Sequence, residues 1–125
     1  MEVEENKEEL ELALNQRGLI KSVIKDNSGA VEDYSKAIEL NPKNADNYFG
    51  RGNVYRDMKN YKMAIVDFSY AIKYDAGNGD LQYSFFNRAM IKKEIGEDFC
   101  QDLKKACELD SVAPGLCDNY NNLCK

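Results

Sequence analysis

Residues 17–38 read RGLIKSVIKDNSGAVEDYSKAI, and residues 51–72 read RGNVYRDMKNYKMAIVDFSYAI. The two stretches align with each other at a shift of 34 residues. The matched pairs are Arg17 with Arg51, Gly18 with Gly52, Ala30 with Ala64, Tyr34 with Phe68, Ala37 with Ala71 and Ile38 with Ile72. A repeat of this period is a small unit of secondary structure that buries its apolar face only by stacking on its neighbours.

Length and charge limit the class of protein. The 125 residues predict one domain that is large enough for a real core. A net charge of -5 argues against a nucleic-acid partner, because phosphates need a basic face to neutralise them. No stretch reaches the roughly 20 apolar residues that span a bilayer, and the start is rich in glutamate, unlike a signal peptide. We therefore expect a soluble chain without membrane insertion.

Helical periodicity runs through the chain, and no segment alternates like a strand. Residues that end or cap helices, such as Pro42, Asn44 and Asn60, separate the periodic segments. We predict helices over residues 8–25, 29–40, 45–58, 61–75, 80–95, 98–109 and 114–124. Alanines seven residues apart let partner helices cross closely, with Tyr34 and Phe68 filling the remaining space. The predicted fold is an all-α stack of antiparallel helical hairpins.

The small, aromatic and alanine residues at these offsets resemble the tetratricopeptide repeat, which has this period and a helix–turn–helix design. The first copy, residues 11–44, has signature places occupied by Leu14, Gly18, Ala30, Tyr34, Ala37 and Pro42. The second copy, residues 45–78, has them occupied by Tyr48, Gly52, Tyr55, Ala64, Phe68 and Ala71, with Ala76 in place of the closing proline. The resemblance implies a right-handed superhelical stack.

A third copy, residues 80–112, departs from the pattern. Arg88 and Ala89 restate the Arg-Gly entry, but the spacing from Ala89 to Ala106 is two residues shorter than in the second copy. We expect a shortened turn around Gly96 and, after a three-residue insertion, a tilted third hairpin. Residues 113–125 are predicted to form the capping helix that covers the last apolar face of a repeat stack. The whole chain, residues 1–125, then forms one domain.

Four cysteines lie in the last quarter of the chain as two pairs, each seven residues apart: Cys100 with Cys107, and Cys117 with Cys124. Seven residues are two helical turns, so each pair shares one stripe of a helix. An antiparallel pairing of the two helices sets Cys107 against Cys117 and Cys100 against Cys124. Three interpretations stay open: free thiols in the core, two nested disulfides, or a zinc site. Disulfides predict an exported or periplasmic protein, and free thiols a cytoplasmic one.

The charged residues predict little chemistry. We expect the run from Glu2 to Glu11 to be a solvated, fraying start. Arg17, Arg51 and Arg88 occur once per copy, and we expect them to pair with acidic side chains between hairpins. The chain has no histidine, which is the commonest general base and metal ligand. We predict no catalytic site, no metal and no cofactor.

In the tetratricopeptide family, the first helix of each hairpin lines a concave groove that holds peptides. The groove residues that the resemblance implies are Leu12, Asn15, Leu19 and Ser22 from the first copy, Phe49, Asn53 and Arg56 from the second, and Tyr83, Phe86, Asn87, Met90 and Lys93 from the third. An aromatic floor ringed by amides and two cations suits an extended peptide with apolar anchors. The alternative is that the three aromatic residues only pack between helices.

Some family members hold the carboxyl-terminal tails of heat-shock chaperones with a clamp of lysine, asparagine and arginine. Here Asn15 and Leu19 stand in the lysine and asparagine places of the first copy, and Gly50 in the asparagine place of the second. We therefore expect chaperone tails not to bind. The predicted function is a non-catalytic module that binds a protein or peptide in the concave groove. The alternative is a structural or self-associating spacer in a larger protein.

Overall fold

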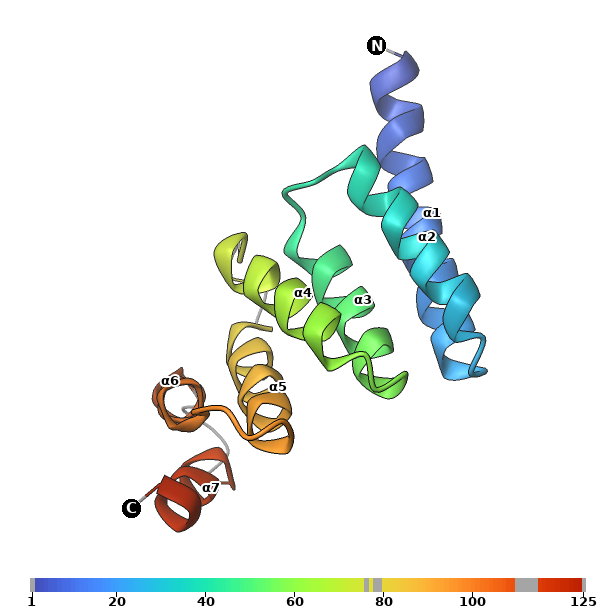
Figure 1. The fold of residues 1–125 in the computed structure, drawn as a ribbon. Helices are drawn as coiled ribbons and strands as arrows, with labels where there is room; N and C mark the ends of the chain where they lie inside the picture. Colours follow the sequence, from blue (N-terminus) through green and yellow to red (C-terminus); the bar gives the residue numbers. More distant parts are fainter. Residues whose placement is uncertain (1, 76, 78–79, 110–114, 125) are drawn as a thin grey trace.

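The computed structural model describes residues 2–75, 77, 80–109 and 115–124. Within these ranges the secondary structure is helical, with no strand. The helices are α1 (Glu2–Val23), α2 (Asn27–Leu40), α3 (Ala45–Asp57), α4 (Tyr61–Lys73), α5 (Leu81–Glu94), α6 (Cys100–Leu109) and α7 (Gly115–Cys124). Figure 1 shows a stack that runs from α1 and α2 at one end to α6 and α7 at the other. The all-α fold is confirmed.

Consecutive helices pair into hairpins: α1 with α2, α3 with α4, and α5 with α6. Successive hairpins contact each other through α2 with α3 and through α4 with α5, and α7 packs on α6 (Figure 1). The first helices of the first two hairpins, α1 and α3, also contact each other. We call the surface that they share the α1–α3 face.

Small residues let the two helices of each hairpin approach closely. A Cβ atom added at Gly18 would lie 3.1 Å from Cε2 of Tyr34, and one added at Gly52 would lie 3.2 Å from Cε1 of Phe68. In the third hairpin a fully buried alanine and a fully buried leucine take these two places: Ala89 and Leu103. The predicted packing of a small residue against a large one is therefore confirmed in the first two hairpins and repeated in the third.

One arginine in each hairpin binds a buried aspartate on the second helix of the same hairpin. Each pair has two N–H···O bonds of 2.7 to 2.9 Å, and the pairs are Arg17 with Asp33, Arg51 with Asp67, and Arg88 with Asp102. Arg51 also donates from Nη1 to Ser35, and Arg88 to Ser69, each over 3.0 Å to the preceding hairpin. The prediction that these arginines pair with acidic side chains between hairpins is therefore wrong. The carboxylate lies within the hairpin, and a hydroxyl group makes the contact across.

The start of α1 differs from the prediction. The helix begins at Glu2, six residues before the predicted start at residue 8, because three glutamates and a lysine among residues 2–7 favour helix. Glu11 is not simply solvated, since its carboxylate accepts hydrogen bonds from the side-chain amides of Asn41, Asn44 and Asn47 over 3.2, 2.7 and 2.8 Å. This part of the acidic run therefore anchors α1 to the segment that leads into α3.

The turn inside each hairpin contains one residue with a left-handed backbone. These residues lie at equivalent places and have φ values of 69°, 61° and 80°: Lys25, Lys59 and Gly96. The next residue donates its N–H to a carbonyl five residues back over 2.8 to 2.9 Å, which is the helix ending of a Schellman motif. Capping side chains start the following helices in the first two hairpins, where Asp26 and Asn60 accept hydrogen bonds from backbone N–H groups.

The expected shortening of the turn around Gly96 is wrong. Five residues, 95–99, separate α5 from α6, whereas three residues, 58–60, separate α3 from α4. The third copy has two residues fewer than the second, and the shortening falls on the first turn of the second helix. α6 starts two residues before Asp102, whereas α4 starts six residues before the equivalent Asp67. Extended backbone spans more distance per residue than helix, so a non-helical connector replaces that turn.

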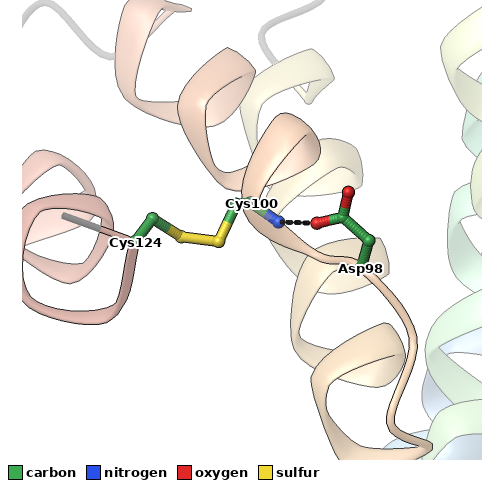
Figure 2. Close-up of a disulfide and its surroundings, with 3 residues drawn as sticks. All are labelled: Asp98, Cys100 and Cys124. Carbon is green, nitrogen blue, oxygen red and sulfur yellow. Dashed lines mark hydrogen bonds between the residues drawn. A yellow bond between two sulfur atoms is a disulfide. The ribbon is translucent and has the colours of Figure 1, made fainter.

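Two disulfides join α7 to α6. Cys100 is bonded to Cys124 and Cys107 to Cys117, with Cα–Cα distances of 5.8 and 4.6 Å. Figure 2 shows the first bond together with Asp98, whose carboxylate accepts a 3.1 Å hydrogen bond from the backbone N–H of Cys100 and so caps the start of α6. Of the three interpretations of the cysteines, the structure contains the nested disulfides. The predicted cap is present as α7.

Candidate functional site

A pocket of about 340 Å³ lies on the α1–α3 face. Its lining residues come from four parts of the chain: Asn15 and Leu19 from α1, Tyr34 from α2, Asp46, Phe49, Gly50 and Asn53 from α3, and Asp80 just before α5. We call this the α1–α3 pocket. A second pocket of about 130 Å³ shares Asn15 and Asp46 with it and is also lined by Glu8, Glu11, Leu12 and Asn44. We call the two adjoining pockets together the groove.

The absence of a side chain at Gly50 opens the pocket. A Cβ atom added there would lie 2.7 Å from the hydroxyl oxygen of Tyr34. Tyr34 is only 3% exposed and belongs to a core cluster with Ala30 and Val54, so its ring has little room to retreat. Burial raises the pKa of Tyr34, so its hydroxyl stays protonated at neutral pH. The pocket therefore has a polar, uncharged edge beside the glycine.

Phe49 supplies the apolar floor of the pocket. Its ring stands edge-to-face with Phe68, with centroids 5.8 Å apart and an interplanar angle of 70°. It also packs against the core cluster of Ala64, Phe68 and Ile91 while one part of it lines the pocket. Phe49 therefore packs between helices and also lines the pocket, so packing is not its only place in the structure.

Amide side chains connect the helices beneath the groove. Asn15 donates from Nδ2 to Oδ1 of Asn47 over 2.7 Å and joins α1 to α3. Asn87 donates in the same way to Asn53 over 3.2 Å and joins α5 to α3. The buried Asn47 in turn donates to Glu11 over 2.8 Å. Asn15 and Asn53 therefore hold neighbouring first helices together and also line the pocket.

The groove is acidic. Its carboxylates come from both pockets: Glu8, Glu11, Asp46 and Asp80. None of the described residues that line it is a lysine or an arginine, and the two predicted cations, Arg56 and Lys93, lie outside the lining. Asp80 comes from the third hairpin and Asp46 from the second. Burial, and after it the negative charge of Asp46, raises the pKa of Asp80.

The α1–α3 pocket brings together four of the predicted groove residues, which are Asn15, Leu19, Phe49 and Asn53, and Leu12 lines the second pocket. The other predicted residues lie elsewhere. Ser22 donates its hydroxyl to the carbonyl of Leu19 over 2.7 Å, and Arg56 lies 3.9 Å from the carboxylate of Asp57. The remaining members line neither pocket, with Tyr83 and Lys93 exposed and Phe86, Asn87 and Met90 half-buried.

Four lining residues of the α1–α3 pocket are missing from the prediction: Tyr34, Asp46, Gly50 and Asp80. The period itself indicates Asp46, because this residue lies 34 positions after Leu12, which the resemblance assigns to the groove. Asp80 precedes a first helix and Tyr34 lies on a second helix. The prediction used first helices alone, so it did not include either residue. Gly50 contributes through space rather than through a side chain.

What the groove offers a ligand is apolar contact, hydrogen bonding and negative charge. In the part of the chain that the structure describes, no three cysteine, aspartate or glutamate side chains are grouped so that they could hold a metal ion. Across the same residues, no helix is both long enough and apolar enough to pass through a membrane.

Paired helices, stacked in order and joined by one Arg–Asp contact per hairpin, define a helical-repeat protein. The particular repeat is given by two family matches. A family model described as TPR repeat matches residues 25–58, and one described as Tetratricopeptide repeat matches residues 45–78. The chain belongs to the tetratricopeptide repeat family.

Curated relatives match part of the chain. Human Tetratricopeptide repeat protein 6 is 38% identical over 77 residues, which are 62% of this chain and 14% of that protein. A UDP-N-acetylglucosamine--peptide N-acetylglucosaminyltransferase from Giardia intestinalis is 35% identical over 79 residues, which are 63% of this chain and 5% of the enzyme. The matched region is therefore a small part of each relative.

Among solved structures, the second TPR domain of human RPAP3, in complex with the HSP70 peptide SGPTIEEVD, is similar in fold. It matches with a TM-score of 0.83 and 20% identity, over 95% of this chain and 98% of that one. At this identity the likeness supports the fold of three hairpins and a final helix.

Proposed function

We propose that this chain binds an extended segment of a protein partner along the groove, without catalysing a reaction on it. The α1–α3 pocket carries the proposal, because it joins an aromatic floor, a leucine and two amides in one hollow of about 340 Å³. Aromatic and aliphatic surface supplies contact energy, and amides hydrogen-bond the backbone of an extended chain. The chain has no histidine to act as a general base, which supports a binding role.

The peptide in the RPAP3 domain, SGPTIEEVD, supports a peptide as the kind of partner. We propose a different peptide chemistry for this chain. Two glutamates and an aspartate in that tail would meet a groove lined by four carboxylates. That chaperone tails do not bind stays a prediction, and the neighbour with its HSP70 peptide gives it no support.

Selection from a phage-displayed peptide library on the immobilised chain tests the proposal. We expect enriched peptides whose affinity falls at least fivefold in Leu19→Ser, because this leucine lines the pocket and is 55% exposed, so its loss leaves the core intact. Leu123→Ser is the matched control, since this leucine is 43% exposed on α7. Failure to enrich any peptide, or equal binding to both variants, would contradict the proposal.

The exposed edge of α1 favours a second candidate function, association of two copies of this chain. Ile20 is 61% exposed, whereas Val54 and Ile91, at the equivalent places of α3 and α5, are 1% and 2% exposed. Val23 at the end of α1 and Ile24 directly after it extend this exposed surface and are 70% and 69% exposed. Apolar surface of this extent commonly marks a contact with another chain.

Multi-angle light scattering tests this second candidate. A dimer in the unmodified chain that becomes a monomer in Ile20→Ser, and persists in the control Leu123→Ser, is the expected result. A monomer at every concentration would remove self-association and leave the groove proposal in place.

We also propose that the protein works outside the reducing cytosol, because two disulfides join its last two helices. Intact mass after alkylation without prior reduction tests this directly. The expected mass is unchanged, since a disulfide has no thiol to alkylate. Four alkylated cysteines would contradict the proposal, and the cytoplasm would then become the proposed location.

A further inference from the structure

We infer that the segment held in the groove is basic, and that one of its lysine or arginine side chains enters the α1–α3 pocket next to an apolar residue. The inference rests on the proposed function and adds the chemistry of the partner. It is carried by the charge and lining of the groove, which differ from the mixture of amides and cations expected from the sequence.

Negative charge extends along the whole groove. Asp46 lies where the two pockets meet, because it lines both. Glu8 and Glu11 line the smaller pocket on one side of it, and Asp80 lines the larger pocket on the other. A bound segment therefore passes carboxylates in each pocket, and such a row attracts a chain of the opposite sign.

The partners of Glu11 leave its charge in the groove. Its carboxylate accepts hydrogen bonds from the amides of Asn41, Asn44 and Asn47. These donors are neutral, so they fix the position of the carboxylate without cancelling its negative charge. The interaction that explains the position of Glu11 thus also preserves its attraction for a cation.

The α1–α3 pocket suits a long cationic side chain. Such a side chain has an apolar stem and a charged head, and the two prefer different surroundings. Phe49 and Leu19 supply apolar surface for the stem. Asp46 and Asp80 supply carboxylates for the head from two different hairpins.

The closeness of these two aspartates strengthens the argument. Burial, the negative charge of Asp46 and a side-chain hydrogen bond with Asp46 all raise the pKa of Asp80, so the two carboxyl groups lie within reach of each other and repel each other when both are ionised. A cation between them relieves this repulsion. An acidic segment would increase it.

Fluorescence anisotropy with three labelled peptides of nine residues tests the inference. The probes are GLRLKLRLG, the counterpart GLELELELG, and the chaperone sequence SGPTIEEVD. We expect the basic peptide to bind at least tenfold more tightly than either acidic one, and its affinity to fall as salt is raised because salt screens exposed charges.

A double variant locates the effect in the pocket. Asp46→Asn combined with Asp80→Asn is expected to weaken binding of the basic peptide about tenfold, since two partly exposed charge contacts are lost. The matched control combines Asp57→Asn with Asp118→Asn, which changes the net charge equally at exposed positions outside the groove lining. Circular dichroism melting checks that both variants fold.

The outcomes separate this inference from the proposed function. Equal loss in the two double variants, or equal affinity for the basic and the acidic peptides, would overturn the inference. Library peptides that lack lysine and arginine yet lose affinity in Leu19→Ser would overturn it too while supporting the proposed function. If no peptide depends on Leu19, the proposed function itself fails.

Discussion

The three buried aspartates that bind arginine have different neighbours. Lys21 lies 3.2 Å from Asp33, and Lys92 lies 3.1 Å from Asp102. In the second hairpin the equivalent place is held by Tyr55, so Asp67 lacks this lysine. Each of the three receives two hydrogen bonds from its arginine, but Arg17 is 57% exposed, whereas Arg51 and Arg88 are 17% and 19% exposed.

The pKa values of the three aspartates follow this difference. Hydrogen bonding to Arg17 lowers the pKa of Asp33. Burial acts to raise the pKa of Asp102, but its arginine and lysine outweigh burial, and the pKa is lowered. Burial outweighs the single arginine at Asp67, and its pKa is raised. Burial and the missing lysine together set Asp67 apart from Asp33 and Asp102.

Tyr55→Lys supplies the missing ammonium group. We expect the pKa of Asp67 to fall, because an additional cation favours the ionised carboxylate. A carboxyl ¹³C NMR titration measures it, with Tyr55→Met as the control that removes the ring without adding charge. An Asp67 pKa that is equal in the two variants would contradict this account.

The lowered pKa values also predict how stability depends on pH. Asp33 and Asp102 have folded-state pKa values below the ordinary 3.8, so the stability that they contribute is present above 3.8 and lost as the pH falls through their folded values. Asp67 and Asp80 have raised values, so they favour the folded state below 3.8 and lose that contribution as the pH rises through their folded values.

We therefore expect the double variant Asp33→Asn, Asp102→Asn to lose less stability between pH 7 and pH 3 than the unmodified chain. Urea denaturation at the two pH values gives the difference in the free energy of unfolding. An equal or larger loss in the variant would show that these two aspartates do not control the loss of stability at acid pH.

At the scale of helices and turns, the left-handed residues end the first helix of each hairpin in the same way. Lys59 adopts φ 61°, a conformation that glycine reaches without the steric cost of a side chain. We expect Lys59→Gly to raise the free energy of unfolding by about 0.5 to 1 kcal/mol, and Gly96→Ala to lower it by about 1 kcal/mol. Chemical denaturation measures both, and a loss of stability in Lys59→Gly would contradict the argument.

The sequence predicted the positions of most helices, but it did not predict where α6 begins. The predicted segments 45–58 and 61–75 correspond to α3 and α4 within two residues, because capping asparagines and the repeated small residues mark their ends. The third copy is two residues shorter than the second, and its second helix, α6, starts one turn later than α4 does. A longer non-helical connector replaces that turn. A deletion in the sequence does not say whether the turn or the helix becomes shorter.

At the scale of the whole molecule, the 34-residue period predicted the stack, and the spacing of the cysteines predicted the pairing of α6 with α7. The sequence predicted fewer of the residues that line the groove. Asp80 and Tyr34 enter the pocket from outside the first helices, so they depend on how hairpins pack rather than on position within a repeat. Asn53 and Asn87 were both expected to line the groove, but only Asn53 does, and Asn87 lies outside the lining and donates a hydrogen bond to Asn53.

The central claim is that a basic segment binds along the α1–α3 face. Titration of the ¹⁵N-labelled chain with GLRLKLRLG, followed by two-dimensional NMR, tests it most directly. The account predicts that the largest shifts occur at the backbone amides of Leu19, Asp46, Gly50 and Asn53, which line one pocket. Largest shifts on the far side of the second hairpin, around Val66 and Tyr70, or no saturable shifts at all, would contradict it.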